Sequence, residues 1–191
     1  MAKKESNFKN MVIALFVVSF VASATLGFVY ELTKEPIRLV EINIKNNAIM
    51  SVVPEFDNNP SEDMIRVASG RDSLTLYQAT KNGELVGTAV ETYTLKGFSG
   101  LIKLMVGFTP DGSIIDIAVL EHKETPGLGD KIEKSKDKFS LQFQGKNPAD
   151  FKLAVTKDNG EVQAITASTI SSRAFCDAVQ KAYDAYMSSK N

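Results

Sequence analysis

Four hydroxyl side chains crowd into six residues near the end of the chain, where an apolar run gives way to a helical pattern. They are Thr166, Ser168, Thr169 and Ser171, termed the hydroxyl cluster below. Serine and threonine commonly cap a helix N-terminus, which presents unpaired amide groups and a partial positive charge. A phosphate suits the same position, so one hydroxyl could carry a phosphoester there. The residue types leave both interpretations open.

Two further stretches contain glycines that could bring the backbone close to a ligand. Residues 120–132 are LEHKETPGLGDKI, in which a proline and two glycines predict a tight loop after a strand. Residues 96–108 are KGFSGLIKLMVGF, in which Gly97 and Gly100 bracket Phe98. Glycine allows close backbone approach, and an aromatic ring between glycines could pack on a flat ligand. A plain turn and a hairpin anchor are the respective alternatives.

Composition excludes several function classes. The formal net charge is −1 for 191 residues, so the sequence has no basic excess and we expect no nucleic-acid partner. The chain has one cysteine, Cys176, and one histidine, His122. It therefore has no internal disulfide, and it lacks a Cys/His cluster for zinc or an iron–sulfur group. With 43% hydrophobic residues, the chain can fill a core, in which we expect Cys176 to be buried.

An uncharged segment near the N-terminus predicts a membrane anchor. Residues 11–30 are MVIALFVVSFVASATLGFVY, long enough to cross a hydrocarbon core of about 30 Å as a helix. Lysines in residues 1–10 favour a cytoplasmic N-terminus, so the rest of the chain should lie outside the cytoplasm. The alternative is a cleaved signal peptide, for which residues 22–24 offer an A-x-A-like site. We favour a retained single-pass anchor, because the apolar run continues to Tyr30.

The remaining sequence predicts a helical linker and loop over 31–73, followed by one α+β domain over 74–191. The linker has apolar residues at helical spacing, with Pro36 near the start of its helix, and a polar loop over 54–63. Turn signals at Asn82-Gly83, Pro110-Asp111-Gly112 and Asp158-Asn159-Gly160 predict three hairpins of an antiparallel sheet. The predicted strands include 74–79, 85–94, 101–108, 114–120, 151–155 and 162–166. Apolar residues between Ile170 and Tyr186 predict a final helix packed on that sheet.

The three notable stretches together resemble a known family. The chain is similar, most strongly from Lys96 to Val179, to the G subunit of the Rnf complex, a membrane-bound ion-translocating ferredoxin:NAD⁺ oxidoreductase. It is more distantly similar to the C subunit of the Na⁺-translocating NADH:quinone reductase. EHKETPGLGDKI follows the family's loop almost letter for letter, and TASTISSR corresponds to its SGAT-type flavinylation motif. The resemblance covers nearly the whole chain, including the N-terminal helix.

This resemblance implies an electron-carrying subunit with an FMN-binding domain on the extracytoplasmic side of the inner membrane. FMN would be attached covalently through a phosphoester to Thr169, with Ser168 as a conceivable rival acceptor. The residues implied at the flavin are Thr169, Ser168, Thr166, Thr125, Gly127, Leu128 and Gly129. Attachment would require FAD, a divalent cation and a separate flavin transferase. The other partners implied are membrane lipid, multi-helix membrane subunits, and iron–sulfur and flavin subunits.

The sequence departs from the family pattern at three positions beside the acceptor. Gln163 stands where the family usually has aspartate, Ala167 replaces its glycine, and Ser168 replaces its alanine. Near the loop, Glu121, Glu124 and Asp130 could tune the flavin, but we expect solvated loop charges. His122 could relay protons, with a polar surface role as the alternative. The competing function is a membrane-anchored flavin sensor outside any electron path. A stand-alone flavoreductase is disfavoured because no substrate domain is evident.

Overall fold

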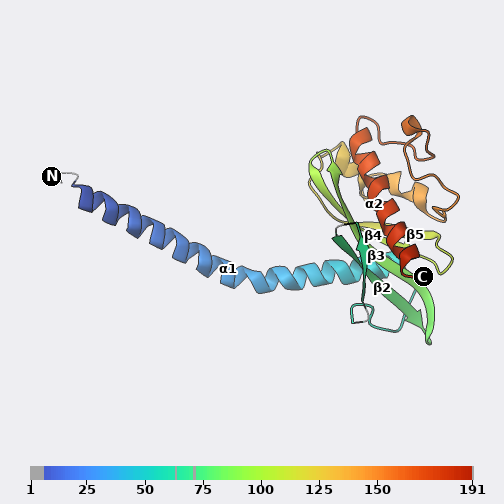
Figure 1. The fold of residues 1–191 in the computed structure, drawn as a ribbon, viewed down its shortest axis with the longest axis horizontal. Coiled ribbons are helices and arrows are strands. Elements are labelled where there is room, and N and C mark those ends of the chain that lie inside the picture. The colour runs from blue at the N-terminus through green and yellow to red at the C-terminus, as the bar shows by residue number, and fades with distance from the viewer. Residues whose placement is uncertain (1–6, 63, 71, 191) are drawn as a thin grey trace. The chain divides into compact units, whose positions relative to one another are not determined.

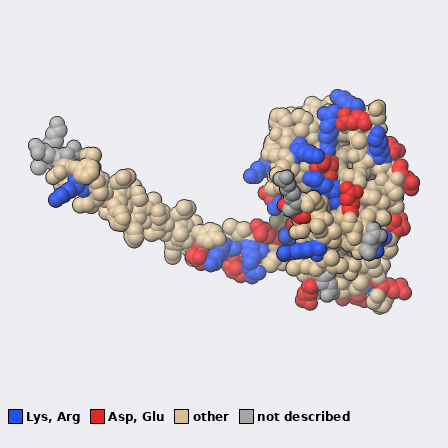
Figure 2. All heavy atoms as spheres, in the orientation of Figure 1, with Lys and Arg blue, Asp and Glu red and all other residues tan. Residues whose placement is uncertain are grey.

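The computed structural model describes residues 7–62, 64–70 and 72–190. The chain divides into two compact units, Met1–Asn43 and Ile44–Asn191, and each is described by itself. The helix α1 (Phe8–Val52) begins in the first unit and ends in the second. Within the described residues, α1 is the one helix long and apolar enough to cross a membrane. Figure 2 shows a long stretch of it without charged side chains.

The helix runs through Pro36 without interruption, so no separate linker helix starts there. Proline removes one backbone hydrogen bond and crowds the preceding turn, which commonly ends or kinks a helix. Here the residues on both sides remain helical, and the side chain of Thr33 donates to the carbonyl of Val29 at 2.9 Å. The polar residues that follow the apolar segment therefore extend the same helix.

The second unit is built on a five-stranded antiparallel sheet with strands in sequence order, as the prediction of an α+β fold requires (Figure 1). Its strands are β1 (Ile65–Ser69), β2 (Asp72–Lys81), β3 (Glu84–Gly97), β4 (Gly100–Phe108) and β5 (Ile114–His122). The predicted turn at Asn82-Gly83 joins β2 to β3, and both residues have positive φ angles, 53° and 82°. The short strand β1, which is largely exposed, was not predicted.

The third predicted hairpin, over 151–166, was wrong. The segment contains a short 3₁₀ helix, η3 (Thr156–Asp158), and only an isolated parallel bridge between Val155 and Val162. Both valines are fully buried, so the apolar residues that suggested strands fill the core instead. Gly160 lies against the backbone of the other arm, because a β-carbon on it would lie 1.9 Å from the carbonyl oxygen of Ala154.

Helices cover both faces of this sheet. On one face lies α2 (Thr169–Ser188), the predicted final helix, which buries Phe175 and stacks Tyr186 on Phe108 at 5.0 Å between ring centroids (Figure 1). Cys176 is buried there, as predicted. On the other face the last turns of α1 bury Ala48, Ile49 and Val52. Packing in these apolar layers holds α2 in place on the sheet. It therefore also positions the first turn of α2 beside the neighbouring loops.

Candidate functional site

The first turn of α2 leaves three backbone amides without hydrogen-bond partners. Ser172 is the first residue whose amide is paired, donating to the carbonyl of Ser168 at 3.1 Å. For residues 169–171, no amide partner occurs within the part of the chain that the structure describes. Free amides and the helix dipole together make a helix N-terminus a favourable place for an anion. A phosphate would therefore be stabilised at this end of α2.

The hydroxyl cluster divides into structural and free members. Ser171 is buried and donates to the carboxylate of Glu124. Thr166 is exposed and lines a different pocket. Ser168, at the helix N-cap, is only 9% exposed. Thr169 is half-buried, and its hydroxyl has no hydrogen-bond partner among the described residues. Thr169 therefore combines accessibility with a free hydroxyl at the amide-rich helix end.

Thr169 opens into a pocket of about 310 Å³ formed by three segments. These are the β3–β4 turn, the glycine loop after β5, and the start of α2. Its lining residues are Phe98, Glu124, Thr125, Leu128, Gly129, Ala167, Ser168, Thr169, Ile170 and Ser171. Of the residues expected at the flavin, Gly127 and Thr166 are the two that do not line it.

The glycine loop, residues 123–130, folds back on Thr125. The amides of Leu128 and Asp130 both donate to the carbonyl of Thr125, at 3.2 and 3.3 Å. Gly127 adopts a φ of 77°, in the region that side chains disfavour, and thus makes the turn possible. The loop leaves Leu128 41% exposed at the rim of the pocket.

Glu124 is not the solvated loop charge that was expected. Its side chain is buried, with the residue 4% exposed, and its two oxygens accept hydrogen bonds from different segments. Oε1 accepts from the amide of Ser99 at 3.0 Å, and Oε2 accepts from the hydroxyl of Ser171. Sequence reasoning missed Ser171 as its partner, because nothing in the spacing relates these two residues. A carboxylate three positions before Gly127 was the available signal.

The two carboxylates that flank the glycine loop, Glu121 at the end of β5 and Asp130 after Gly129, differ from each other. Glu121 is exposed and pairs with Lys103 at 3.0 Å. Asp130 is only 6% exposed, so the expectation of a solvated charge was wrong for it too. The backbone amide of Gly127, helped by Lys136 at 3.1 Å, lowers the pKa of Asp130 below its ordinary value.

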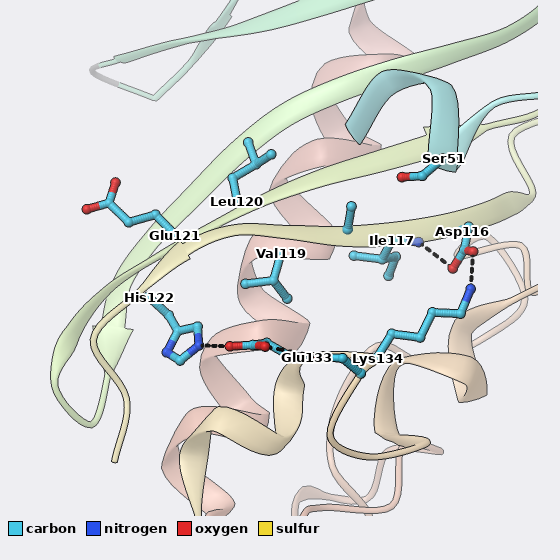
Figure 3. A pocket seen from close by; sticks show the side chains of 11 residues that line it. Ser51, Asp116, Ile117, Val119, Leu120, Glu121, His122, Glu133 and Lys134 are labelled. Carbon is cyan, nitrogen blue, oxygen red and sulfur yellow. Dashed lines mark hydrogen bonds and ion pairs between the residues drawn. The ribbon is translucent and has the colours of Figure 1, made fainter. Parts of the chain in front are cut away.

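His122 has partners for both ring nitrogens. Its Nδ1 accepts from the amide of Glu124 at 3.0 Å, which places the proton on Nε2. Nε2 lies 2.6 Å from Oε1 of Glu133, and this hydrogen bond is the main cause that lowers the pKa of Glu133 (Figure 3). His122 therefore fixes the chain direction just before the glycine loop.

A larger pocket, of about 670 Å³, lies beside β5 but offers less chemistry (Figure 3). A hydrogen bond, His122–Glu133, and an ion pair, Asp116–Lys134, join β5 to residues 133–134 across it. Its main charged groups are thus already paired. Among the described residues, no group of three or more His, Cys, Asp or Glu side chains could hold a metal ion. The Thr169 pocket is the better candidate, since it combines a free hydroxyl with free amides.

Comparisons with known proteins show which family the chain belongs to. A family model described as an FMN-binding domain matches residues 97–184, which include all three segments of the Thr169 pocket. The chain is 38% identical over 183 residues to the G subunit of the ion-translocating oxidoreductase complex of Pasteurella multocida, covering 88% of both chains. The chain belongs to this family of G subunits.

Other members of the G-subunit family align over similar lengths. The G subunit of the ion-translocating oxidoreductase complex of Aliivibrio fischeri is 34% identical over 183 residues, which is 91% of this chain and 86% of the relative. The G subunit of the Na⁺-translocating ferredoxin:NAD⁺ oxidoreductase complex of Acetobacterium woodii is 33% identical over 187 residues, 90% of this chain and 88% of the relative. The sequence-based resemblance is therefore confirmed, and the chain is one subunit of an ion-translocating oxidoreductase complex.

Proposed function

We propose that this chain is the electron-transferring G subunit of a ferredoxin:NAD⁺ oxidoreductase of the Rnf type, carrying FMN covalently on Thr169. The observation that carries this proposal is the free, accessible hydroxyl of Thr169 at the amide-rich start of α2. The G subunit of Acetobacterium woodii, which bears the name of such an oxidoreductase, supports the reaction class.

The residues of the pocket fit an FMN phosphoester. The amides of residues 169–171 would donate to the phosphate oxygens, where the helix dipole also favours negative charge. Phe98 and Leu128, both exposed at the rim, would contact the apolar ring system. When bound, FMN supplies the reversible uptake and release of electrons. A covalent tether holds the cofactor in one place, where a dissociated FMN would otherwise be lost.

Thr169 is a better acceptor than its neighbour Ser168. The serine is 9% exposed and occupies the helix N-cap, so a transferase would have less access to its hydroxyl. A separate flavin transferase, with a divalent cation, would break the pyrophosphate of FAD, join the FMN phosphate to the Thr169 oxygen, and release AMP and the hydroxyl proton. Because the enzyme must reach this turn, the exposed Thr166 and Gln163 lie where it would bind.

The acceptor assignment is tested by producing the full chain together with a flavin transferase. Wild-type protein should keep a fluorescent flavin in denaturing gels and show the FMN-phosphoryl mass on the peptide containing Thr169. Thr169→Ala should abolish both signals, Thr169→Ser should retain them, and Ser168→Ala is the matched control that should leave them unchanged. An adduct that survives Thr169→Ala would move the site elsewhere.

The proposed orientation places the N-terminus in the cytoplasm and the domain on the periplasmic face of the inner membrane. The lysines before the apolar segment support it. A membrane-impermeant amine reagent added to intact cells with a permeable outer membrane should label the exposed Lys152 and Lys157. Protection of both lysines in intact cells, with labelling after lysis, would refute this orientation.

The proteins that bind this chain distinguish an electron carrier from a sensor. As an electron carrier, the chain should co-purify in mild detergent with multi-helix membrane subunits and with iron–sulfur and flavin subunits. Purification from the native membrane followed by mass spectrometry checks this. Recovery of the flavinylated chain without such subunits would favour the sensor.

A further inference from the structure

A single buried carboxylate joins the three segments that form the Thr169 pocket. Glu124 itself belongs to the start of the glycine loop, one residue before Thr125. Through Oε1 it holds the amide of Ser99 in the β3–β4 turn, and through Oε2 it holds the hydroxyl of Ser171 in the first turn of α2. Ser171 is two residues from Thr169, so this contact restrains the turn that carries the acceptor.

Two glycines make room for the two oxygens of Glu124. A β-carbon on Gly129 would lie 2.6 Å from Oε2 and 2.8 Å from Oγ of Ser171. A β-carbon on Gly97 would lie 2.5 Å from the carbonyl oxygen of Gly100 and 2.7 Å from Oε1. A side chain at Gly129 would displace the carboxylate or Ser171, and one at Gly97 would also displace the backbone of the β3–β4 turn. Gly129 therefore serves this internal contact, and Gly97 serves both the contact and the turn.

The environment of Glu124 suits an acceptor of hydrogen bonds. Both of its partners donate to it, and hydrogen bonds to a charged acceptor are stronger than those between neutral groups. The loss of either hydrogen bond is costly, because the carboxylate is buried and water cannot replace the lost partner. The geometry of the three segments is therefore coupled through this one side chain.

We propose that Glu124 is the positioning residue for the Thr169 acceptor, holding the first turn of α2 against the glycine loop and the β3–β4 turn. The proposal rests on flavin attachment at Thr169. Glu124 would act on the acceptor through Ser171, without contacting the phosphate or the reacting hydroxyl itself. Orientation of an acceptor affects the rate of transfer steeply, since a displacement of about 1 Å can cost about 100-fold.

The test measures flavin transfer to full-length variants with purified transferase, FAD and Mg²⁺, as kcat and as KM for FAD. Glu124→Ala should lower kcat by about 10- to 100-fold while KM for FAD stays unchanged, because binding of the flavin donor is not involved. Glu124→Gln should stay within about threefold of wild type, since its amide can accept from Ser99 and donate to Ser171. Glu121→Gln, an exposed carboxylate near the end of β5, is the matched control and should equal wild type.

Ser171→Ala provides a second variant that keeps the carboxylate buried and removes only one contact. It should lower kcat in the same direction, and combining it with Glu124→Ala should add little, since both break the same link. Thermal unfolding of each variant shows whether the protein variants used as transferase substrates are folded. Transfer to Glu124→Ala or Ser171→Ala at the wild-type kcat would overturn the positioning role, as would equal losses for Glu124→Gln and Glu124→Ala. Failure of the proposed function would give a different result. In that case the wild-type chain would accept no flavin, or the Thr169→Ala chain would still accept it.

Discussion

Replacing Ala167 by glycine should stabilise the protein, although glycine usually destabilises. Ala167 has a φ of 62°, in the left-handed region that costs a residue with a β-carbon about 1–2 kcal/mol. Its side chain is exposed, so the substitution loses little packing. Against this gain, glycine increases the entropy of the unfolded chain, at a cost of about 0.4–1 kcal/mol. The net expectation is a gain of about 0.5–1 kcal/mol, or about 1–4 °C in Tm for a chain of this size.

The measurement is thermal unfolding of the full chain in detergent, followed by circular dichroism. Ala149→Gly is the matched control, because Ala149 is also exposed but has no positive φ. That control should lower Tm, whereas Ala167→Gly should raise it. Glycine adopts this φ without strain, so flavin transfer to this variant should be no slower than to wild type. A drop in Tm equal to that of Ala149→Gly would refute the strain argument.

Three further predictions concern the core and the charges around it. Gly107→Ala should lower the free energy of unfolding in urea by about 3 kcal/mol or more, because the new β-carbon would lie 1.7 Å from the carbonyl oxygen of Val52. Burial raises the pKa of Asp177, but hydrogen bonds, including one from Lys96 at 2.6 Å, outweigh burial and leave this pKa below its ordinary value. Asp177→Asn should therefore destabilise at pH 7, and urea titrations should show the difference shrinking as pH falls below about 4. Burial raises the pKa of Cys176 to about 12, so iodoacetamide at pH 8 should modify it only after unfolding, as read by mass.

Local turn chemistry made much of the fold predictable. Asn82-Gly83 specifies a tight hairpin because both residues tolerate positive φ, and the flanking strands are long enough to pair. The same reasoning failed at Asn159-Gly160, where Asn159 also has a positive φ of 56°. There the flanking arms are short and pack into the core under α2, so a turn signal predicted the turn but not a ladder. Propensity cannot distinguish the two outcomes, because burial against distant residues decides between them.

The candidate site shows a different limit of sequence reasoning. The motif located Thr169 and the glycine loop, but it could not say which atoms the glycines accommodate. The glycines suggest space for a ligand, whereas Gly129 makes room for the carboxylate of Glu124, and Gly97 for the carbonyl oxygen of Gly100 as well as that carboxylate. That carboxylate becomes buried only when the β3–β4 turn and α2 close over it, so its role exists only in the folded chain. A glycine in a cofactor motif therefore shows that another group comes close to the backbone there. That group can be a side chain of the protein itself instead of the cofactor.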